Sequence, residues 1–132
     1  MILVDTSVWV DFLRGEDSSQ RRLFHRLIED EADISMTEII FTEILQGIKN
    51  DGEFQAIRDY LLEFPLYTPK GIETYLHAAR IYRNCRKKVK TVRRTIDCII
   101  AAICIENDLT LLHKDSDFDL IQACTGLQVI QV

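Results

Sequence analysis

Several hallmarks of a membrane or secreted protein are absent from this sequence of 132 residues. No basic residue precedes the apolar run at the N-terminus, so this run lacks the form of a signal peptide. The longest uninterrupted apolar stretch runs from Cys98 to Ile105, far short of the ~20 residues that a membrane-spanning helix needs. No internal repeat, low-complexity segment or linker divides the chain. We therefore expect residues 1–132 to form one globular domain in the cytoplasm.

The cysteines also lack the spacing of a metal or disulfide framework. No two of them form a C-x-x-C pair, and two lie inside an apolar helical segment. The four are Cys85, Cys98, Cys104 and Cys124. We expect all of them to be small, buried thiols in a reducing cytosol.

An excess of positive charge is lacking as well, because the net charge is −5. Taken alone, this charge argues against a protein that binds polyanions. The basic residues are nevertheless unevenly distributed: eight of the sixteen lie between Arg80 and Arg94, and no acid lies between Arg80 and Ile96. This basic stretch contains Arg80, Arg83, Arg86, Lys87, Lys88, Lys90, Arg93 and Arg94. This stretch fits either a solvated helix end and loop or a surface that contacts phosphates. Because it lies directly before Asp97, we favour a phosphate-contacting role for part of the stretch.

Short apolar runs alternate with amphipathic stretches along the whole chain. The runs predict strands at residues 1–4, 32–36, 64–67, 109–113 and 127–132. The other stretches predict helices at about 8–13, 21–29, 37–49 and 53–62, then from 69 into the basic stretch, at 95–106, and from 115 to before 126. This alternation is typical of a parallel sheet covered on both faces by helices. The expected fold class is α/β, a single α/β/α sandwich around a central, mostly parallel sheet of four to five short strands.

The first predicted strand ends on an acid. Asp5 follows it directly, and Thr6 and Ser7 place two hydroxyl groups beside that carboxylate; either of them is also a candidate cap of the next helix. In open α/β sheets, ligands bind just beyond the carboxyl ends of the strands. Asp5 is therefore a candidate metal ligand, although an ordinary turn or cap aspartate would give the same local pattern.

Two further acids lie on predicted helices close to the core. Glu43 borders an apolar stripe, and Gly47 follows one turn later, which suggests a carboxylate that faces a cleft. An ordinary boundary glutamate explains Glu43 equally well. Asp97 stands alone in the first turn of the most apolar helix, where a favourable interaction with the helix dipole would also account for it.

Asp115 and Asp117 follow the predicted strand at 109–113, on the same edge of the sheet as Asp5. One of them must cap the following helix, which leaves the other free for chemistry. Carboxylates packed together repel one another, and a bound cation removes that penalty. Oxygen-only ligation suits Mg²⁺, or Mn²⁺ in its place, and the natural reaction of such a site is phosphodiester hydrolysis.

Four motifs in this order resemble those of PIN-domain proteins, and in particular of the VapC toxins of VapBC toxin–antitoxin pairs. The motifs are Val4-Asp5-Thr6-Ser7-Val8-Trp9-Val10-Asp11-Phe12-Leu13, Thr42-Glu43-Ile44-Leu45-Gln46-Gly47, Thr95-Ile96-Asp97-Cys98-Ile99-Ile100-Ala101 and Leu111-Leu112-His113-Lys114-Asp115-Ser116-Asp117-Phe118. The resemblance covers the whole chain. It implies a PIN-like fold and a Mg²⁺-dependent endoribonuclease.

The resemblance also implies roles for individual residues. The catalytic acids would be Asp5, Glu43, Asp97, Asp115 and Asp117, of which Asp5, Asp97 and Asp115 would bind the metal. The family further implies homodimers and a VapB-like antitoxin whose tail covers the acidic site. For RNA binding, we expect contributions from Thr6, Ser7, Lys87, Lys88, Lys90, Arg93 and Arg94.

Rival functions lack residues that they need. A receiver domain would need an aspartate after its third strand, but Phe64-Pro65-Leu66-Tyr67-Thr68 contains no acid. A phosphatase of the haloacid-dehalogenase type would need an aspartate at the position of Ser7. A catalytically inactive PIN-like binding module is the remaining alternative, and the presence of every acid of the pattern argues against it.

Overall fold

The computed structural model covers all 132 residues and contains a four-stranded sheet. The strand order is β2-β1-β3-β4, and every neighbouring pair is parallel. The strands are β1 (Ile2–Val4), β2 (Ile34–Ser35), β3 (Thr110–Leu112) and β4 (Gln128–Val129). The α/β class with a parallel sheet of four short strands is thus confirmed. The fifth strand predicted at 64–67 is reduced to one parallel bridge between Met36 and Leu66, because Pro65 has no amide hydrogen to donate to a ladder.

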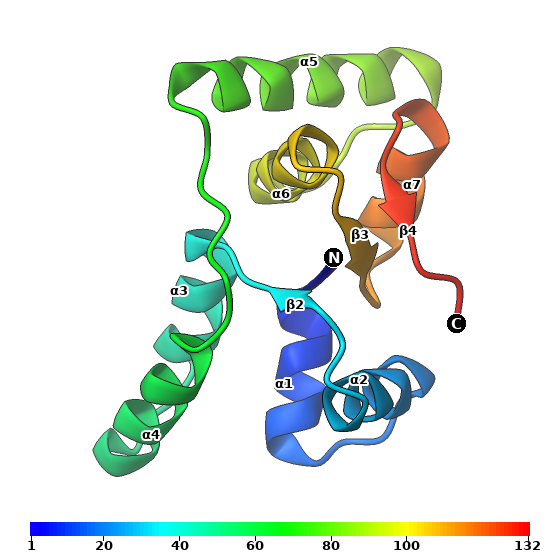
Figure 1. The fold of residues 1–132 in the computed structure, drawn as a ribbon. Coiled ribbons are helices and arrows are strands. Elements are labelled where there is room, and N and C mark those ends of the chain that lie inside the picture. The colour runs from blue at the N-terminus through cyan, green and yellow to red at the C-terminus, as the bar shows by residue number, and fades with distance from the viewer.

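Seven helices surround this sheet (Figure 1). They are α1 (Thr6–Arg14), α2 (Ser19–Glu29), α3 (Glu38–Gln46), α4 (Asp51–Leu61), α5 (Ile72–Lys88), α6 (Thr95–Glu106) and α7 (Ser116–Cys124). In the view of Figure 1, α1 and α2 lie below the sheet and α5 and α6 above it, while α3 and α4 form an arm to one side. The result is a three-layered sandwich with an appended helical arm.

The centre of the core is formed by β1, β3 and α6. Helix α6 is apolar nearly all round, as the sequence predicts, and seven of its residues are buried. It packs chiefly against α5, which spans the top of the molecule in Figure 1. Its first turn therefore lies at the edge of the core, and this turn carries Asp97.

Helix caps differ in three places from the sequence-based expectation. Asp5, not Thr6 or Ser7, caps α1, with its carboxylate accepting a hydrogen bond from the backbone N–H of Ser7. The helix predicted at 53–62 begins two residues earlier, because Asn50 caps α4 by accepting from the N–H of Glu53. Gly47 does not lie inside a helix, because α3 ends at Gln46 and Gly47 is its C-cap.

The expectation of four free thiols is wrong for one pair. Cys85 on α5 and Cys124 at the end of α7 are joined by a disulfide, whereas Cys98 and Cys104 are free and buried. The pairing follows from the packing of α5 against α7, which brings the two Cα atoms to 5.9 Å, within the usual range for a disulfide. Separately, none of the helices is long and apolar enough to cross a membrane.

Candidate active site

The parallel pairing of β1 with β3 places the first predicted acid. Val4 is in register with Leu112, and the backbone N–H of Asp5 donates to the carbonyl of Leu112 at 2.9 Å. The segments that follow the two strands therefore leave the sheet side by side. Ser7 links them: its hydroxyl donates to Asp5 Oδ2 at 2.6 Å and accepts from the N–H of Lys114 at 3.3 Å.

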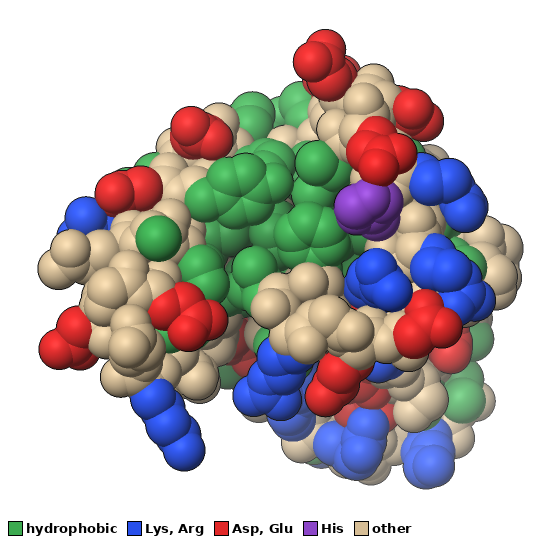
Figure 2. Space-filling view, turned by 90° about the horizontal axis from the view of Figure 1, so that it is seen from below, with side chains coloured by type: hydrophobic (Ala, Val, Ile, Leu, Met, Phe, Trp, Pro, Cys, Tyr) green, Lys and Arg blue, Asp and Glu red, His purple; other side chains and the backbone are tan.

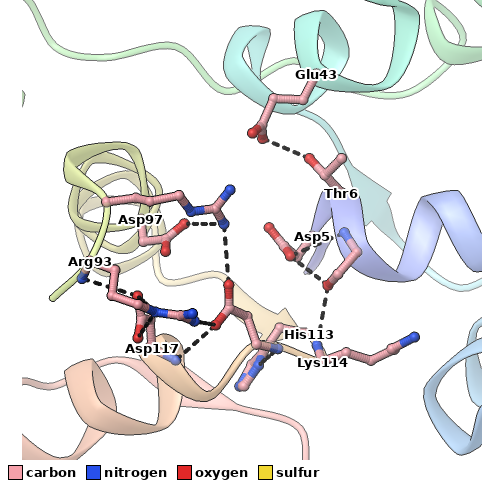
Figure 3. A network of polar contacts seen from close by, with 11 residues as sticks. Asp5, Thr6, Glu43, Arg93, Asp97, His113, Lys114 and Asp117 are labelled. Atoms are coloured by element: carbon pink, nitrogen blue, oxygen red, sulfur yellow. Dashed lines mark hydrogen bonds and ion pairs between the residues drawn. The ribbon is translucent and has the colours of Figure 1, made fainter. Parts of the chain in front are cut away.

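Helix α3 brings in Glu43 from the arm. The hydroxyl of Thr6, at the start of α1, donates to Glu43 Oε1 at 2.8 Å. Figure 3 shows Glu43 and Thr6 meeting on one side of the site, with Asp5 next to them and Asp97 opposite. The two hydroxyl residues expected beside Asp5 thus divide their contacts, Ser7 to Asp5 and Thr6 to Glu43.

A groove extends from Glu43 between α1 and the arm, with a volume of about 370 Å³. Its walls combine apolar and polar residues: Val10, Leu13, Ile44, Ile48 and Ile57 line it together with Arg14, Glu43, Gly47, Lys49, Asn50 and Glu53. Seen from below, hydrophobic side chains line the hollow between the arm and the rest of the molecule (Figure 2). The cleft predicted from Glu43 and Gly47 therefore exists.

Asp97 lies on the inner side of the site and is 1% exposed. Burial raises the pKa of its carboxyl group to about 6; Arg94 opposes this shift, and the charges of Asp115 and Asp5 add to it. One oxygen, Oδ1, accepts from Arg94 at 3.1 Å, but the buried Oδ2 has no hydrogen-bond partner. An unpartnered buried carboxylate oxygen is costly. The Oδ2 atom of Asp97 thus lacks a hydrogen-bond donor.

Asp115 and Asp117 have different environments. Asp115 caps α7 by accepting from the N–H of Asp117 at 3.0 Å. The Asp115 carboxylate also accepts hydrogen bonds from Arg93 at 3.1 Å and from Arg94 at 3.2 Å. Although it caps α7, Asp115 therefore still contacts the other residues of the site. Asp117, expected to be the free one if Asp115 is the cap, is buried and bound at both oxygens by Arg93 (Figure 3). That expectation is therefore wrong.

The negative charge of the carboxylates suits a divalent cation, but the carboxylates are not gathered into a ligand set around one point. No three carboxylate, imidazole or thiol groups are gathered as a ligand set. Two guanidinium groups, from Arg93 and Arg94, lie among the carboxylates instead. Arg94 bridges Asp97 and Asp115, but the Oδ2 atom of Asp97 stays unpartnered, and a hard cation would satisfy it. Asp5, Asp97 and Asp115 are the residues that could hold it.

The remaining predicted residues lie at different distances from the acids. Thr6, Ser7, Arg93 and Arg94 all contact an acid of the site. Lys87 and Lys88 end α5, and Lys90 follows in the coil. These three lysines are exposed and form no ion pair.

Two residues escaped the sequence-based prediction, Asp11 and Lys114. The ammonium group of Lys114 forms an ion pair with the carboxylate of Asp11, which is 4% exposed on α1. Burial opposes ionisation of Asp11, but the contacts with Lys114 outweigh it and hold the pKa of Asp11 below its usual value. The pair ties the loop that carries Asp115 to α1. An acid among the apolar positions of an amphipathic helix was the available signal.

Comparison with known proteins identifies the family. The sequence profile of the PIN domain matches residues 2–123. The chain belongs to the PIN-domain family. This PIN domain is 37% identical over 129 residues to ribonuclease VapC11 of Mycobacterium tuberculosis, which covers 97% of the chain and 96% of the relative. Ribonuclease VapC51 of the same organism is 33% identical over 124 residues, with 94% and 87% covered.

Solved structures share the fold of this PIN domain. The VapBC2 structure from Rickettsia felis, bound to a DNA fragment from its promoter, superposes with a TM-score of 0.74 at 16% identity, covering 98% of each chain. The VapBC-1 structure from nontypeable Haemophilus influenzae gives 0.72 at 18% identity, covering 98% of this chain and 97% of that one. At these identities the similarity establishes the three-dimensional arrangement alone.

Proposed function

We propose that this PIN domain is a Mg²⁺-dependent endoribonuclease and the toxin of a type II toxin–antitoxin pair. The observation that carries the proposal is the buried Asp97, which has one unpartnered carboxylate oxygen and lies in one site with Asp5, Asp115 and Glu43 (Figure 3). Relatives that are 37% and 33% identical over nearly the whole chain are named ribonucleases, which supports RNA as the substrate. Such an enzyme meets its RNA in the cytoplasm.

The proposed metal ligands are Asp5, Asp97 and Asp115. A bound Mg²⁺, or Mn²⁺ in its place, would lower the pKa of a bound water and neutralise the charge that develops on the phosphate. Two of these carboxylates are oriented by neighbours and would hold the ion in a fixed place: Ser7 donates to Asp5, and Asp115 accepts from the N–H of Asp117 at the start of α7. Asp97 is held by burial in the core.

Glu43 and Asp117 have proposed roles without metal ligation. The Oε1 atom of Glu43 accepts from Thr6, which leaves Oε2 to accept a hydrogen bond from the attacking water. Asp117 keeps the coil before α6 in place through Arg93 and so acts as a positioning residue. Thr6, Ser7, Arg93 and Arg94 lie within the site, whereas Lys87, Lys88 and Lys90 extend its basic rim for RNA phosphates.

The groove beside Glu43 is the proposed docking place of the antitoxin. Apolar side chains of α1 and the arm line it together with charged ones, and Glu43 is among its lining residues. A short amphipathic segment of a VapB-like partner would bury its apolar face there and cover the site with its end. The solved relatives include toxin–antitoxin complexes, which supports a partner of this kind. We also propose a homodimer, as the family resemblance implies.

Cleavage assays of purified wild type and Asp97→Asn test the proposal directly. Asparagine keeps the shape of the side chain but loses the charge that attracts the cation, so the variant should lose at least about 100-fold in rate with Mg²⁺ or Mn²⁺. Asp30→Asn, at an exposed position after α2, serves as the matched control and should cleave as wild type does. Undiminished cleavage by Asp97→Asn, or cleavage in excess chelator, would contradict the mechanism. A wild-type protein that binds RNA without cleaving it would instead be an inactive binding module.

A further inference from the structure

Two neighbouring arginines enter the acidic site and are anchored differently. Arg93 fastens the coil before α6 to α7: its backbone N–H donates to Asp117 Oδ2 at 3.1 Å, and its Nε donates to Oδ1 at 3.1 Å and Oδ2 at 3.2 Å. The carboxylate that receives these bonds is only 9% exposed. Arg93 also donates from Nη2 to Asp115 Oδ1 at 3.1 Å, and its side chain is 68% exposed, but its three bonds to Asp117 fasten it to α7 independently of the proposed metal ligands.

Arg94 is held by one nitrogen only. Its Nη2 donates to Asp97 Oδ1 at 3.1 Å and to Asp115 Oδ2 at 3.2 Å, so that a single N–H₂ group joins α6 to the loop after β3. Arg94 is also the N-cap residue of α6, but its side chain makes no capping hydrogen bond. The side chain is 54% exposed, and its other guanidinium nitrogens form no hydrogen bond within the chain.

Positive charge already lies on the proposed metal ligands, because Arg93 pairs with Asp115 and Arg94 pairs with both Asp97 and Asp115. Arg94 places a positive charge on two of the three carboxylates that we propose as metal ligands. A divalent ion at the same carboxylates would repel the guanidinium group of Arg94. Asp97 Oδ2 remains unpartnered while Arg94 is in place, so the arginine meets only part of the demand for positive charge.

We propose that Arg94 is a built-in competitor of the metal, occupying the acidic site until the ion binds and then turning outward to bind the RNA phosphate. This inference rests on the proposed function. The exposed side chain needs to break only two contacts to leave, whereas Arg93 stays attached to Asp117. The apparent metal affinity is then weakened by the fraction of molecules in which Arg94 occupies the site.

Titration of Mn²⁺ into the RNA-free protein tests the competition, with free Mn²⁺ measured by electron paramagnetic resonance. Arg94→Ala should lower the dissociation constant by about fivefold or more. Arg83→Ala is the matched control, since it removes one positive charge from an exposed position on α5 that contacts no acid, and should change the constant little. Arg94→Lys, which keeps the charge, should lie between Arg94→Ala and wild type. Circular dichroism melts establish that each variant is folded.

The outward movement is tested separately by arginine modification. Phenylglyoxal labelling followed by peptide mass spectrometry should show faster modification of Arg94 in wild type when Mn²⁺ is present, and no such change at Arg83. An unchanged or weaker Mn²⁺ affinity in Arg94→Ala would overturn the inference, as would labelling of Arg94 that Mn²⁺ does not accelerate.

These outcomes are distinguishable from a failure of the proposed function. If wild type binds Mn²⁺ and Asp97→Asn does not, the proposed metal site stands even when Arg94→Ala leaves the affinity unchanged. If no variant binds Mn²⁺ at millimolar concentration, both the metal site and the competition are refuted.

Discussion

At the scale of single residues, the buried charge of Asp97 is the most consequential feature of the site. Its carboxyl pKa is about 6, against an ordinary value of 3.8, because burial disfavours the ionised form. A raised pKa in the folded state means that stability is fully present below about pH 3.8 and is lost as the pH rises toward 6. Above pH 6 the ionised, buried Asp97 lowers the free energy of unfolding of the metal-free protein by its full amount, on the order of 1–3 kcal/mol.

Asp97→Asn should therefore stabilise the metal-free protein at pH 7.5 by on the order of 1–3 kcal/mol, and by much less at pH 4.5. Urea unfolding in the presence of chelator, at both pH values, measures this difference. Added Mg²⁺ should stabilise wild type but not the variant, because binding to the folded state alone raises stability. A variant that is less stable than wild type at pH 7.5 would show that Arg94 already compensates the buried charge.

The acids that the sequence pointed to follow strands, begin a buried helix or, for Glu43, border an apolar helix stripe, and these are local signals. Asp5 and Asp115 could be placed on one edge because parallel strands end on the same side. The contacts of Asp11 with Lys114 and of Arg93 with Asp117 could not be predicted, because each joins segments distant in sequence. Only the packing of α1 and α7 against the sheet sets those distances.

At the scale of elements, the end of α5 and the coil after it form a basic rim on an acidic protein. Replacing Lys87, Lys88 and Lys90 by alanine should weaken RNA binding and flatten its salt dependence, and the slope should fall by ~0.7 for each single-strand phosphate that the variant no longer binds. Arg93 is left intact, since its contacts with Asp117 are structural. Filter binding across a salt series, with non-cleaving Asp97→Asn as background, measures the slope.

A charge-matched control for the rim removes Arg21, Arg22 and Arg26 from α2, on the opposite side of the sheet. This control should leave most of the salt slope in place, because only long-range attraction is removed. If the lysine variant keeps the full slope but has no turnover, the rim serves folding or dimer contacts and not RNA.

The disulfide between α5 and α7 is a further property at this scale. Its cysteines are 39 residues apart, so closing this loop in the unfolded chain should stabilise the fold by about 2–4 kcal/mol. Dithiothreitol should therefore lower the melting temperature of wild type, and Cys85→Ser should melt at the lower temperature with or without reductant. Melting of wild type that is indifferent to reductant would show that the bond does not form in solution.

Sequence patterns predicted nearly every element but not this bond. Helix periodicity and short apolar runs are local signals, and they placed all four strands within a few residues. The pairing of Cys85 with Cys124 depends on the crossing of α5 and α7 near those two residues. The spacing of the cysteines along the chain does not predict where α5 and α7 cross. Composition alone favoured four free thiols.

At the scale of the whole molecule, exposed hydrophobic side chains are unevenly distributed. Of the nine large hydrophobic residues that are exposed, five lie between the end of α4 and the first turns of α5. They are Leu62, Leu66, Ile72, Tyr75 and Leu76, with Ile72 exposed by 78%. Ile72, Tyr75 and Leu76 have the i, i+3, i+4 spacing of one helix face. An exposed apolar helix face of this kind is typical of a protein interface.

This surface is our candidate for the dimer contact. In a two-fold dimer the same patch meets itself, so one pair of substitutions acts twice in each interface. Ile72→Asp with Leu76→Asp buries four carboxylates where apolar side chains would meet, and like charges at that distance repel. Light scattering at micromolar concentration should therefore give twice the chain mass of 15.3 kDa for wild type and the single mass for the variant.

The matched control adds two aspartates to α2, as Ser19→Asp and His25→Asp, at exposed positions away from the patch. It should remain dimeric with the same net addition of acid groups. Since Ile72 and Leu76 are exposed in the single chain, their substitution should change the monomer's own stability little, and urea unfolding checks this. A wild type that scatters as a monomer would refute the dimer itself. A double variant that remains dimeric would show that the two copies meet at another surface. The patch on α5 would then not be the dimer contact.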